Sequence, residues 1–396
     1  MRFKDIIPLQ DQIYENLSNI DINKPSAIQE GVFCHVLAGQ DLIAVSPTGT
    51  GKTLAYLLPV FSMLKSDISK PQAVILAPTH ELAAQIKRET DIMANGTDIK
   101  SSLIIGGANL QRQLTALKEK PQVIIGAAGR INELYSMKKL TLHFVRTIVV
   151  DEADRMLNEK NIKQTKAVIN ATLKDRQLLF FSASMDNTTT ETAQNLSKNA
   201  VVVNISKMSG KGTLPDNIEH IYFECDKRDR VETLRKIIHA LGILTSPAKP
   251  CESCARFSQG NKKKAIIFSG NQNEAENISS RLNYHEIKTV SLCGQNLKEE
   301  RRLALDSFRK GNVNVLSATD LAARGLDIKG EIYVFCIGVS SDSYVYLHRA
   351  GRTGRMNKKG TAITIVAPDE VYRLKRIEKS LGIKISKREI SNGKIK

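Results

Sequence analysis

The sequence predicts an α/β protein built from two doubly wound parallel-sheet domains. Short apolar, β-branched runs alternate with longer helical patterns throughout the 396 residues. Such strands separated by helices are typical of βαβ units, in which both faces of a parallel sheet are covered. The alternation forms two series, and in the stretch KMSGKGTLP between them glycine, serine and proline replace the periodic pattern. The length also exceeds what one ordinary core can hold.

The expected strands of the first series are residues 41–45, 72–77, 102–105, 123–125, 147–150 and 177–181. Those of the second series are residues 265–268, 288–292, 313–317, 332–336 and 362–366. Near the end of the chain, Val371, Leu374, Ile377 and Leu381 share one face of a helix that Gly382 would cap. We therefore expect a first domain over residues 1–207, a linker over 208–216, a second domain over 217–382 and a basic tail over 383–396.

The composition indicates a partner of opposite charge. The net charge is +17, and such an excess points to a polyanion, most often nucleic acid, although a basic surface can also serve solubility alone. No uninterrupted apolar run reaches about 18 residues, so we expect no transmembrane helix and no membrane partner. The first residues show no secretory signal, and the six cysteines do not make a disulfide framework in a chain of this size. We therefore expect a cytoplasmic protein with reduced thiols.

A phosphate-binding loop is expected directly after the strand at residues 41–45. The loop consists of Ser46, Pro47, Thr48, Gly49, Thr50, Gly51, Lys52 and Thr53, and it opens an apolar helix. The glycines allow backbone N–H groups to turn onto phosphate oxygens, and the helix N-terminus adds positive potential. Lys52 would reach the β- and γ-phosphates, and the hydroxyl of Thr53 would bind Mg²⁺. Ser46 stands where the general pattern has its first glycine.

A buried-strand pattern ends in three carboxylates in the segment IVVDEAD, residues 148–154. Two adjacent carboxylates about 4 Å apart repel each other by roughly 4 kcal/mol at an effective dielectric constant of about 20. The cluster therefore needs either solvent or a cation, and a solvated acidic turn is one alternative. Asp151 follows a strand at the edge where doubly wound sheets bind ligands. We expect it to hold Mg²⁺, mainly through water, and Glu152 to orient and deprotonate the attacking water.

These two segments together resemble the DEAD-box family of ATP-dependent RNA helicases, in superfamily 2. The letters DEAD at residues 151–154 and the upstream SPTGTGKT resemble the motifs of this family, and further motifs follow in its order from Phe3 to about Gly382. The resemblance implies two RecA-like domains joined by a flexible linker. It also implies hydrolysis of ATP to ADP and phosphate with Mg²⁺, and RNA as the partner.

Further motifs contain residues that the resemblance assigns to the ATP reaction. Gln29, in the segment INKPSAIQ, would read adenine through its side-chain amide. Phe3 would pack on the base, although an ordinary core position is the alternative for this ring. In the second domain the resemblance assigns Asp327 to the ribose and Arg352 and Arg355 to the γ-phosphate as arginine fingers. Ser182 and Ser184 lie in the segment SAS, which resembles the motif that couples hydrolysis to strand separation in this family.

Other motifs resemble those that contact RNA. The residues expected to bind RNA are Pro78, Thr79, Gly106, Gly107 and Arg130 in the first domain, and Arg301, Thr319 and Gly325 in the second. Four residues depart from the pattern of the family, namely His80, Ala127, Ala128 and Lys298. These departures bear on RNA affinity, whereas the residues expected for the ATP reaction are present.

The function implied is ATP-dependent, local unwinding of RNA duplexes or remodelling of ribonucleoproteins by a monomeric core. RNA and ATP would together close the cleft between the domains, so that the ATPase depends on RNA. Contacts chiefly to the RNA backbone would make binding independent of sequence. An ATP-gated RNA clamp or assembly platform with little unwinding is the alternative, and a DNA helicase is less favoured. Cys251 and Cys254 could form half of a zinc site, which needs four ligands.

Overall fold

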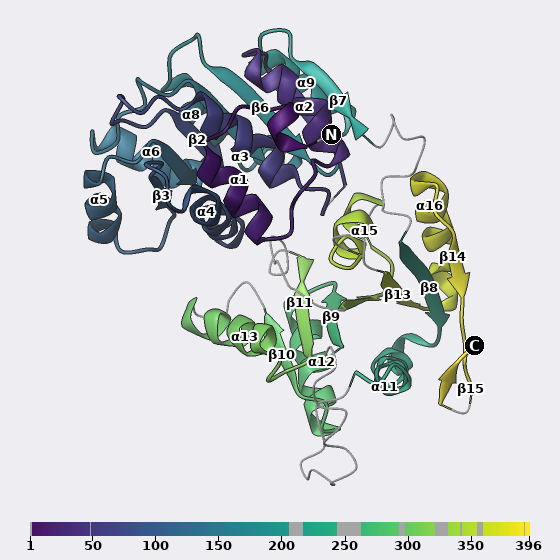
Figure 1. Cartoon of the computed structure of the whole chain (residues 1–396). Coiled ribbons are helices and arrows are strands. Elements are labelled where there is room, and N and C mark those ends of the chain that lie inside the picture. The colour runs from purple at the N-terminus through teal and green to yellow at the C-terminus, as the bar shows by residue number, and fades with distance from the viewer. Residues whose placement is uncertain are drawn as a thin grey trace. The chain divides into compact units, whose positions relative to one another are not determined.

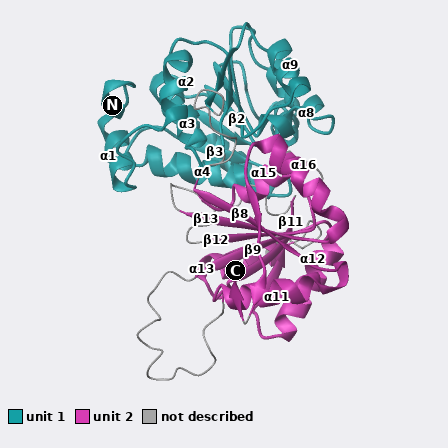
Figure 2. Ribbon diagram, turned by 90° about the vertical axis from the view of Figure 1, so that its right-hand side faces the viewer, with its two compact units in different colours: residues 1–210 teal, residues 211–396 magenta. Residues whose placement is uncertain are grey.

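The structure, a computed structural model, describes residues 2–47, 49–205, 217–243, 263–292, 298–320, 332–340, 343–354, 359–391 and 393–396, without the side chains of residues 298, 299 and 344. The chain forms two compact units, residues Met1–Gly210 and Lys211–Lys396, which Figure 2 shows in different colours. The expected linker at residues 208–216 lies outside the described residues.

The first unit contains a parallel seven-stranded sheet with the order β3-β4-β2-β5-β6-β1-β7. Figure 1 labels β2, β3, β6 and β7 of this sheet. Its strands are β1 (Leu42–Val45), β2 (Ala73–Leu76), β3 (Ser101–Ile104), β4 (Val123–Gly126), β5 (Thr147–Asp151), β6 (Gln177–Ser182) and β7 (Val201–Asn204). The expected strands β1 to β6 are confirmed, whereas β7 was not expected. β7 pairs with β1 at the edge of the sheet. The sequence after it is the irregular stretch between the two series, so no strand–helix alternation marks this strand.

Helices cover both faces of the first sheet. They are α1 (Asp11–Asn19), α2 (Ala27–Leu37), α3 (Lys52–Met63), α4 (His80–Ala94), α5 (Leu110–Lys118), α6 (Ala128–Ser136), α7 (Ala153–Met156), α8 (Ile162–Asn170) and α9 (Asn187–Leu196), after the short 3₁₀ helix η1 (Phe3–Asp5). Successive side chains of β1 enter different cores, because Leu42 and Ala44 pack with α1 to α4 while Ile43 packs with α6 to α9. Burial on both faces explains why these strands are continuous apolar runs.

The second unit repeats this plan with the strand order β10-β11-β9-β12-β13-β8-β14. Its strands are β8 (Ile218–Glu224), β9 (Lys264–Ser269), β10 (Thr289–Leu292), β11 (Val315–Thr319), β12 (Ile332–Ile337), β13 (Gly360–Val366) and β14 (Ile385–Lys387). Its helices are α11 (Arg230–Ala240), α12 (Gln272–Tyr284), α13 (Lys298–Lys310), α15 (Ser343–Ala350) and α16 (Val371–Leu381), with the 3₁₀ helices η2 (Lys227–Asp229) and η5 (Pro368–Glu370). The strands expected for this unit are confirmed, and β8 and β14 are additional.

The helix expected near the end of the chain is confirmed as α16. Leu374, Ile377 and Leu381 are buried, and Gly382 caps the helix with a left-handed φ of 62°. The following residues, expected as a basic tail over residues 383–396, contain regular structure. Three of them form β14, which pairs with β8, and a small hairpin of β15 (Ile390–Ser391) and β16 (Lys394–Ile395) follows. This segment is therefore folded onto the second unit.

Candidate active site

The phosphate loop connects β1 to α3 in the first unit. Two of its glycines, Gly49 (φ 80°) and Gly51 (φ 92°), have left-handed backbone conformations that side chains rarely tolerate. A Cβ atom on Gly51 would also lie only 2.6 Å from the side-chain nitrogen of Gln29. Glycine is therefore required at position 51 by both the backbone conformation and the space. Thr48 lies outside the described residues.

Lys52 is the first residue of α3, and its side chain folds back over the loop. Its ammonium group donates to the carbonyl oxygens of Ser46 (2.6 Å) and Pro47 (2.7 Å). The hydroxyl of Thr50 lies 2.8 Å from the hydroxyl of Ser46 and donates to the Pro47 carbonyl oxygen at 2.8 Å. A phosphate oxygen would be a stronger partner for Lys52 than these neutral carbonyls, because the attraction between opposite charges adds to the hydrogen bond.

Asp151 ends β5, on the strand next to β6, and is buried. Its Oδ1 accepts a hydrogen bond from the backbone N–H of Glu152 (2.8 Å), and its Oδ2 accepts one from the hydroxyl of Tyr56 (3.0 Å). Burial and the neighbouring Glu152 carboxylate raise the pKa of Asp151 to about 6, against the opposing effect of Lys52. The alternative of a solvated acidic turn is therefore wrong for Asp151.

Glu152 has a left-handed backbone (φ 47°, ψ 54°), which is uncommon for a residue with a side chain and often occurs at functional sites. Its side chain is 16% exposed, and Oε2 lies 3.5 Å from Nη1 of Arg155. This oxygen accepts no hydrogen bond from the described part of the chain. Glu152 thus has a buried carboxylate oxygen with spare acceptor capacity.

The acidic box is tied to the end of β6. The hydroxyl of Ser182 lies 2.8 Å from Oδ1 of Asp154 and 2.7 Å from the carbonyl oxygen of Ser184. The backbone N–H of Ser184 also points at the Ser182 hydroxyl, at 3.4 Å. Of the two serines expected at this motif, Ser182 is the one whose hydroxyl contacts the acidic box in the structure.

Gln29 lies in the first turn of α2 and is buried. Its Oε1 accepts the backbone N–H of Ser26 (2.9 Å), and its Nε2 donates to the carbonyl oxygen of Gly51 (3.1 Å). An amide oxygen has a second lone pair and an amide nitrogen a second hydrogen, so both groups keep capacity for a base edge. Phe3 is 4% exposed and its ring lies 6.4 Å from that of Phe33. The core position considered for Phe3 is thus the one observed, and its contact with adenine stays a prediction.

The residues expected to bind RNA in the first unit follow three neighbouring strands. Pro78 and Thr79 follow β2, Gly106 and Gly107 follow β3, and Arg130 follows β4. Since carboxyl ends of parallel strands meet at one edge, these residues gather there. Thr79 caps α4 by accepting the N–H of Leu82 (3.2 Å), and Arg130 pairs with Glu133 (2.7 Å).

Of the four departures, three lie at this same edge. His80 begins α4, and its Nε2 would lie 3.6 Å from a Cβ atom on Gly106. Ala127 is the N-cap residue of α6 and offers no side-chain hydrogen bond, and Ala128 begins the helix. The side chain of Lys298, the fourth departure, is outside the described set.

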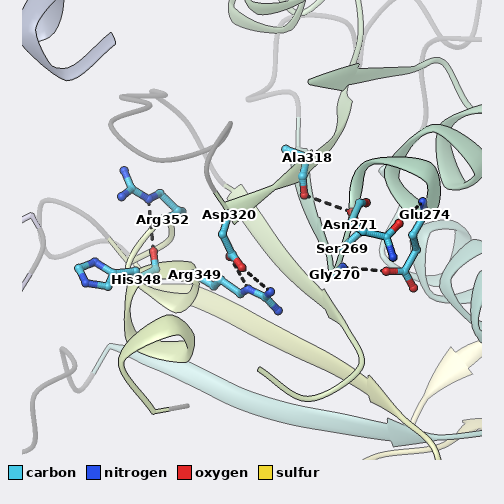
Figure 3. A network of polar contacts seen from close by, with 9 residues as sticks. All are labelled: Ser269, Gly270, Asn271, Glu274, Ala318, Asp320, His348, Arg349 and Arg352. Atoms are coloured by element: carbon cyan, nitrogen blue, oxygen red, sulfur yellow. Dashed lines mark hydrogen bonds and ion pairs between the residues drawn. The ribbon is translucent and has the colours of Figure 1, made fainter. Parts of the chain in front are cut away.

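In the second unit, Arg349 and Arg352 make different contacts although they lie only three positions apart in the sequence (Figure 3). Arg349 makes a bidentate ion pair with Asp320, in which Nε lies 2.7 Å from Oδ1 and Nη2 lies 2.8 Å from Oδ2. Only 5% of the Arg349 side chain is exposed. Arg352 donates from Nε to the carbonyl oxygen of His348 (3.3 Å) and is buried. The two guanidinium groups point in opposite directions (Figure 3).

The other expected residues of this unit are only partly described. Thr319 ends β11 and Arg301 lies on α13, and both are half-buried. Gly325, Asp327, Arg355, Cys251 and Cys254 lie outside the described residues. The sequence reasoning missed Tyr56, which belongs to no catalytic pattern that the chain alone reveals, and it named no partner for Arg349.

The residues at the phosphate loop fit a magnesium ion bound with a nucleotide. Mg²⁺ prefers oxygen ligands, keeps several waters, and is usually held by one or two carboxylates together with phosphate oxygens. Asp151 and Thr53 offer such oxygens, and the described residues contain no cluster of three His, Cys, Asp or Glu side chains that would form an all-protein metal cage. A cation would also relieve the repulsion that raises the pKa of Asp151.

The fold and this site define a two-domain phosphate-loop enzyme with an acidic box. Residues 26–192 match the DEAD/DEAH box helicase family, and residues 248–357 match the helicase conserved C-terminal domain. The chain is 37% identical to the DEAD-box ATP-dependent RNA helicase CshC of Bacillus cereus, over 98% of this chain and 93% of the relative. It is 35% identical to the probable ATP-dependent RNA helicase YfmL of Bacillus subtilis, over 98% and 96%.

Among solved structures, the chain resembles that of Dbp5 of S. cerevisiae bound to RNA and ADP BeF3, with a TM-score of 0.83 and 27% identity. The match covers 98% of this chain and 95% of that one. The chain therefore belongs to the DEAD-box family of ATP-dependent RNA helicases, and each of its two units is a RecA-like domain. It is an ATP-hydrolysing enzyme of the helicase class.

No helix in the described ranges is both long enough and apolar enough to cross a bilayer.

Proposed function

We propose that this chain couples RNA-stimulated ATP hydrolysis to the local opening of RNA duplexes or the remodelling of ribonucleoproteins. The observation that carries the proposal is the contact between the acidic box and the phosphate-loop helix. Tyr56, on the helix that Lys52 begins, donates a hydrogen bond to Asp151 at 3.0 Å. This contact joins the helix of the phosphate-binding Lys52 to the buried Asp151, and Glu152 is the next residue, as nucleotide hydrolysis requires.

In the first unit we assign each residue of the reaction a role. Lys52 and the loop N–H groups bind the phosphates of ATP, and Thr53 and Asp151 hold Mg²⁺. The ion supplies positive charge at the β- and γ-phosphate oxygens. Glu152 orients the attacking water and takes its proton, a role that the spare acceptor capacity of its Oε2 supports. Gln29 reads adenine with the amide groups that remain after its two protein contacts.

The second unit supplies the remaining charge in this proposal. Arg352 and Arg355 offset the negative charge that develops at the γ-phosphate, and Asp327 binds the ribose. Because these groups come from a separate unit, the reaction requires the two units to close around ATP and RNA. Turnover is then stimulated by RNA, and hydrolysis releases the closed state.

RNA binding in this proposal does not read sequence. The residues at the edge beside β2, β3 and β4 are backbone-contact types, namely glycines, a hydroxyl and an arginine, and they suit phosphates and sugars. The net charge of +17 adds a general attraction to a polyanion. The hydrogen bond between Ser182 and Asp154 joins the acidic box to β6, which gives hydrolysis a physical connection to the rest of the first unit.

The test is the Glu152→Gln variant. Loss of the base should lower RNA-stimulated ATP turnover by roughly 10²- to 10⁴-fold, while equilibrium binding of ATP and of a single-stranded RNA persists, because the amide keeps the size of the side chain. Wild-type turnover in this variant would remove Glu152 from the role of base. Absence of nucleotide binding by the wild-type chain, with RNA present, would refute the proposed function as a whole.

A second candidate function is an ATP-gated RNA clamp with little unwinding. It is favoured by His80, Ala127 and Ala128, which lie at the RNA edge where the family pattern has the charge of an arginine, the hydroxyl of a threonine and the rigid ring of a proline. A labelled short-duplex unwinding assay beside the RNA-stimulated ATPase assay separates the two. RNA-stimulated ATPase without strand separation supports the clamp, whereas both activities together support the helicase.

We also place this activity in the cytoplasm. Among the described cysteines, Cys34, Cys225 and Cys336 are free thiols, which is the state expected in a reducing compartment.

A further inference from the structure

Tyr56 is a polar group in the core of the first unit to which the reaction above assigns no role of its own. It lies on α3, one helical turn after Lys52, and its side chain is fully buried. Its ring packs edge-on against that of Phe181 on β6, with centroids 5.2 Å apart and an interplanar angle of 65°. Its hydroxyl donates to Oδ2 of Asp151 at 3.0 Å. The ring is an ordinary core side chain, but the hydroxyl ends on the carboxylate of the acidic box.

The Asp151 carboxylate is held at both of its oxygens. Oδ1 accepts from the backbone N–H of Glu152 (2.8 Å), while Oδ2 accepts from Tyr56. A carboxylate that accepts one donor at each oxygen has its rotation about the Cβ–Cγ bond fixed, yet each oxygen keeps further lone pairs for water or a cation. The first donor is the backbone of the next residue, directly after the end of β5. The second comes from the helix that begins at Lys52, 95 residues away in the sequence from Asp151.

The Tyr56 hydroxyl therefore connects the two halves of the nucleotide site directly. The phosphate loop and α3 bind the nucleotide, and the acidic box binds its metal ion. If these two elements shift relative to each other, the contact breaks, and the carboxylate loses its orientation. Groups that hydrogen-bond a metal-binding carboxylate in this way commonly alter metal affinity by roughly 10- to 100-fold when they are removed.

We propose that Tyr56 is a positioning residue, whose hydroxyl orients the Asp151 carboxylate toward the Mg²⁺ that enters with ATP. The inference rests on the proposed function, because it assumes that Asp151 faces a nucleotide-bound ion. Phenylalanine at this position would retain the packing on Phe181 and lose the orienting hydrogen bond to Asp151. Tyr56→Phe thus removes the hydroxyl oxygen and leaves the buried ring in place.

The experiment is a Mg²⁺ titration of nucleotide binding by the Tyr56→Phe variant. A fluorescent ATP analogue is bound at equilibrium to the full chain, first in EDTA and then at increasing Mg²⁺. We expect wild-type affinity in EDTA and a roughly tenfold higher Mg²⁺ concentration for half of the metal-dependent gain. The RNA-stimulated ATPase should show the same displacement in its Mg²⁺ requirement.

Tyr14→Phe is the matched control. Tyr14 is in the same unit, and its hydroxyl bonds only backbone groups, donating to the carbonyl oxygen of Ile7 and accepting from the N–H of Leu9. Its removal should lower the thermal unfolding midpoint to a similar degree without changing the Mg²⁺ requirement. Equal Mg²⁺ titrations for Tyr56→Phe, Tyr14→Phe and the wild type would overturn the proposal.

A double-mutant cycle with Asp151→Asn gives an independent check. If Tyr56 acts through Asp151, adding Tyr56→Phe to Asp151→Asn should cause no further change in the Mg²⁺ dependence of binding. An additional shift of the same size in the Asn background would contradict the proposal. Wild-type binding of Mg²⁺ and ATP is read in the same experiment, so its failure would instead refute the proposed function.

Discussion

The side-chain nitrogen of Gln29 donates to the carbonyl oxygen of Gly51, 3.1 Å away, so the start of α2 is attached directly to the phosphate loop, at the residue before α3. Gln29 is buried, and its oxygen is occupied by the N–H of Ser26. A change at Gln29 should consequently be felt in the loop as well as at the adenine. The glutamine thus has a structural role beside the base-reading one that the sequence motif implies.

The first prediction is that Gln29→Ala lowers ATP affinity by about tenfold or more, because a hydrogen bond to the loop and a contact to the base are both lost. Equilibrium binding of a fluorescent ATP analogue measures it. The control is Gln72→Ala, since Gln72 is also buried and also bonds backbone groups, namely those of Lys65 and Ile68. We expect comparable loss of stability in both variants, and an equal loss of ATP affinity would contradict a specific role for Gln29.

The second prediction concerns the ion pair between Arg349 and Asp320. Asp320→Ala leaves a nearly buried guanidinium without its partner, which should lower the free energy of unfolding by about 3–5 kcal/mol. The exposed pair of Arg146 and Asp175, with side chains 60% and 62% exposed, provides the control. There Asp175→Ala should cost less than about 1 kcal/mol. Urea unfolding measures both, and equal costs would show that burial does not set the strength of the Arg349 pair.

The third prediction is that Gly354→Ala destabilises the second unit more than Gly382→Ala does. Both glycines have left-handed backbones, with φ of 66° and 62°. A Cβ atom on Gly354 would lie 2.4 Å from Cγ1 of Ile218, whereas one on Gly382 would meet nothing within 4 Å. Gly382→Ala should therefore cost about 1 kcal/mol from the backbone alone, and Gly354→Ala that amount plus the clash.

Thermal unfolding of the two glycine variants compares these costs. Gly354→Ala should also lower RNA-stimulated ATP turnover, because Gly354 precedes Arg355 and its carbonyl oxygen accepts the side-chain amide of Asn217 at 2.9 Å. Identical unfolding midpoints for the two variants would show that the second unit repacks around Ile218 without strain.

The fourth prediction is a pH dependence of stability that originates at His220. Burial lowers the pKa of His220 from 6.5 to about 4, and its Nδ1 lies 2.9 Å from the hydroxyl of Tyr346. The unfolded chain then binds more protons than the folded chain between these two pH values. His220 therefore leaves stability unaffected above pH 6.5 and lowers it as the pH falls to 4, by on the order of 3 kcal/mol.

The His220→Gln variant should flatten this part of the pH profile, because an amide can bond Tyr346 without titrating. Urea unfolding at intervals between pH 4 and pH 7 measures the difference between wild type and variant. A difference that stays constant over this interval would mean that His220 takes up its proton as easily in the folded chain as in the unfolded one.

The interior strands of both sheets other than β8 could be predicted from the sequence, because strands covered on both faces are apolar throughout and are followed by helices. The strands β7 and β14 lie at sheet edges and are short, with partly exposed side chains, so the same signal is weak in them. β8 is interior but follows the linker, where no preceding helix marks it. The place of these three strands in their sheets is determined by pairing with segments that are distant in the sequence, and the local pattern does not reveal it.

At the site, the sequence identified the phosphate loop and the acidic box because their chemistry is encoded in adjacent residues. Tyr56 could not be found in this way. Within α3 it occupies one more position in an apolar run, and its functional partner is 95 residues distant in the chain. The choice between Ser182 and Ser184 also depended on which hydroxyl faces Asp154 at the end of β6, and only the backbone path settles that.

The strand that carries the phosphate loop has both of its neighbours late in the first unit. β1 pairs with β6 and β7, which are formed from residues 177–204. During synthesis on the ribosome, β1 therefore emerges with two open edges that stay unpaired until more than a hundred further residues have left the exit tunnel. An open apolar strand is prone to pair with other chains. Nascent or truncated chains that stop before residue 204 should accordingly need chaperones to remain unaggregated.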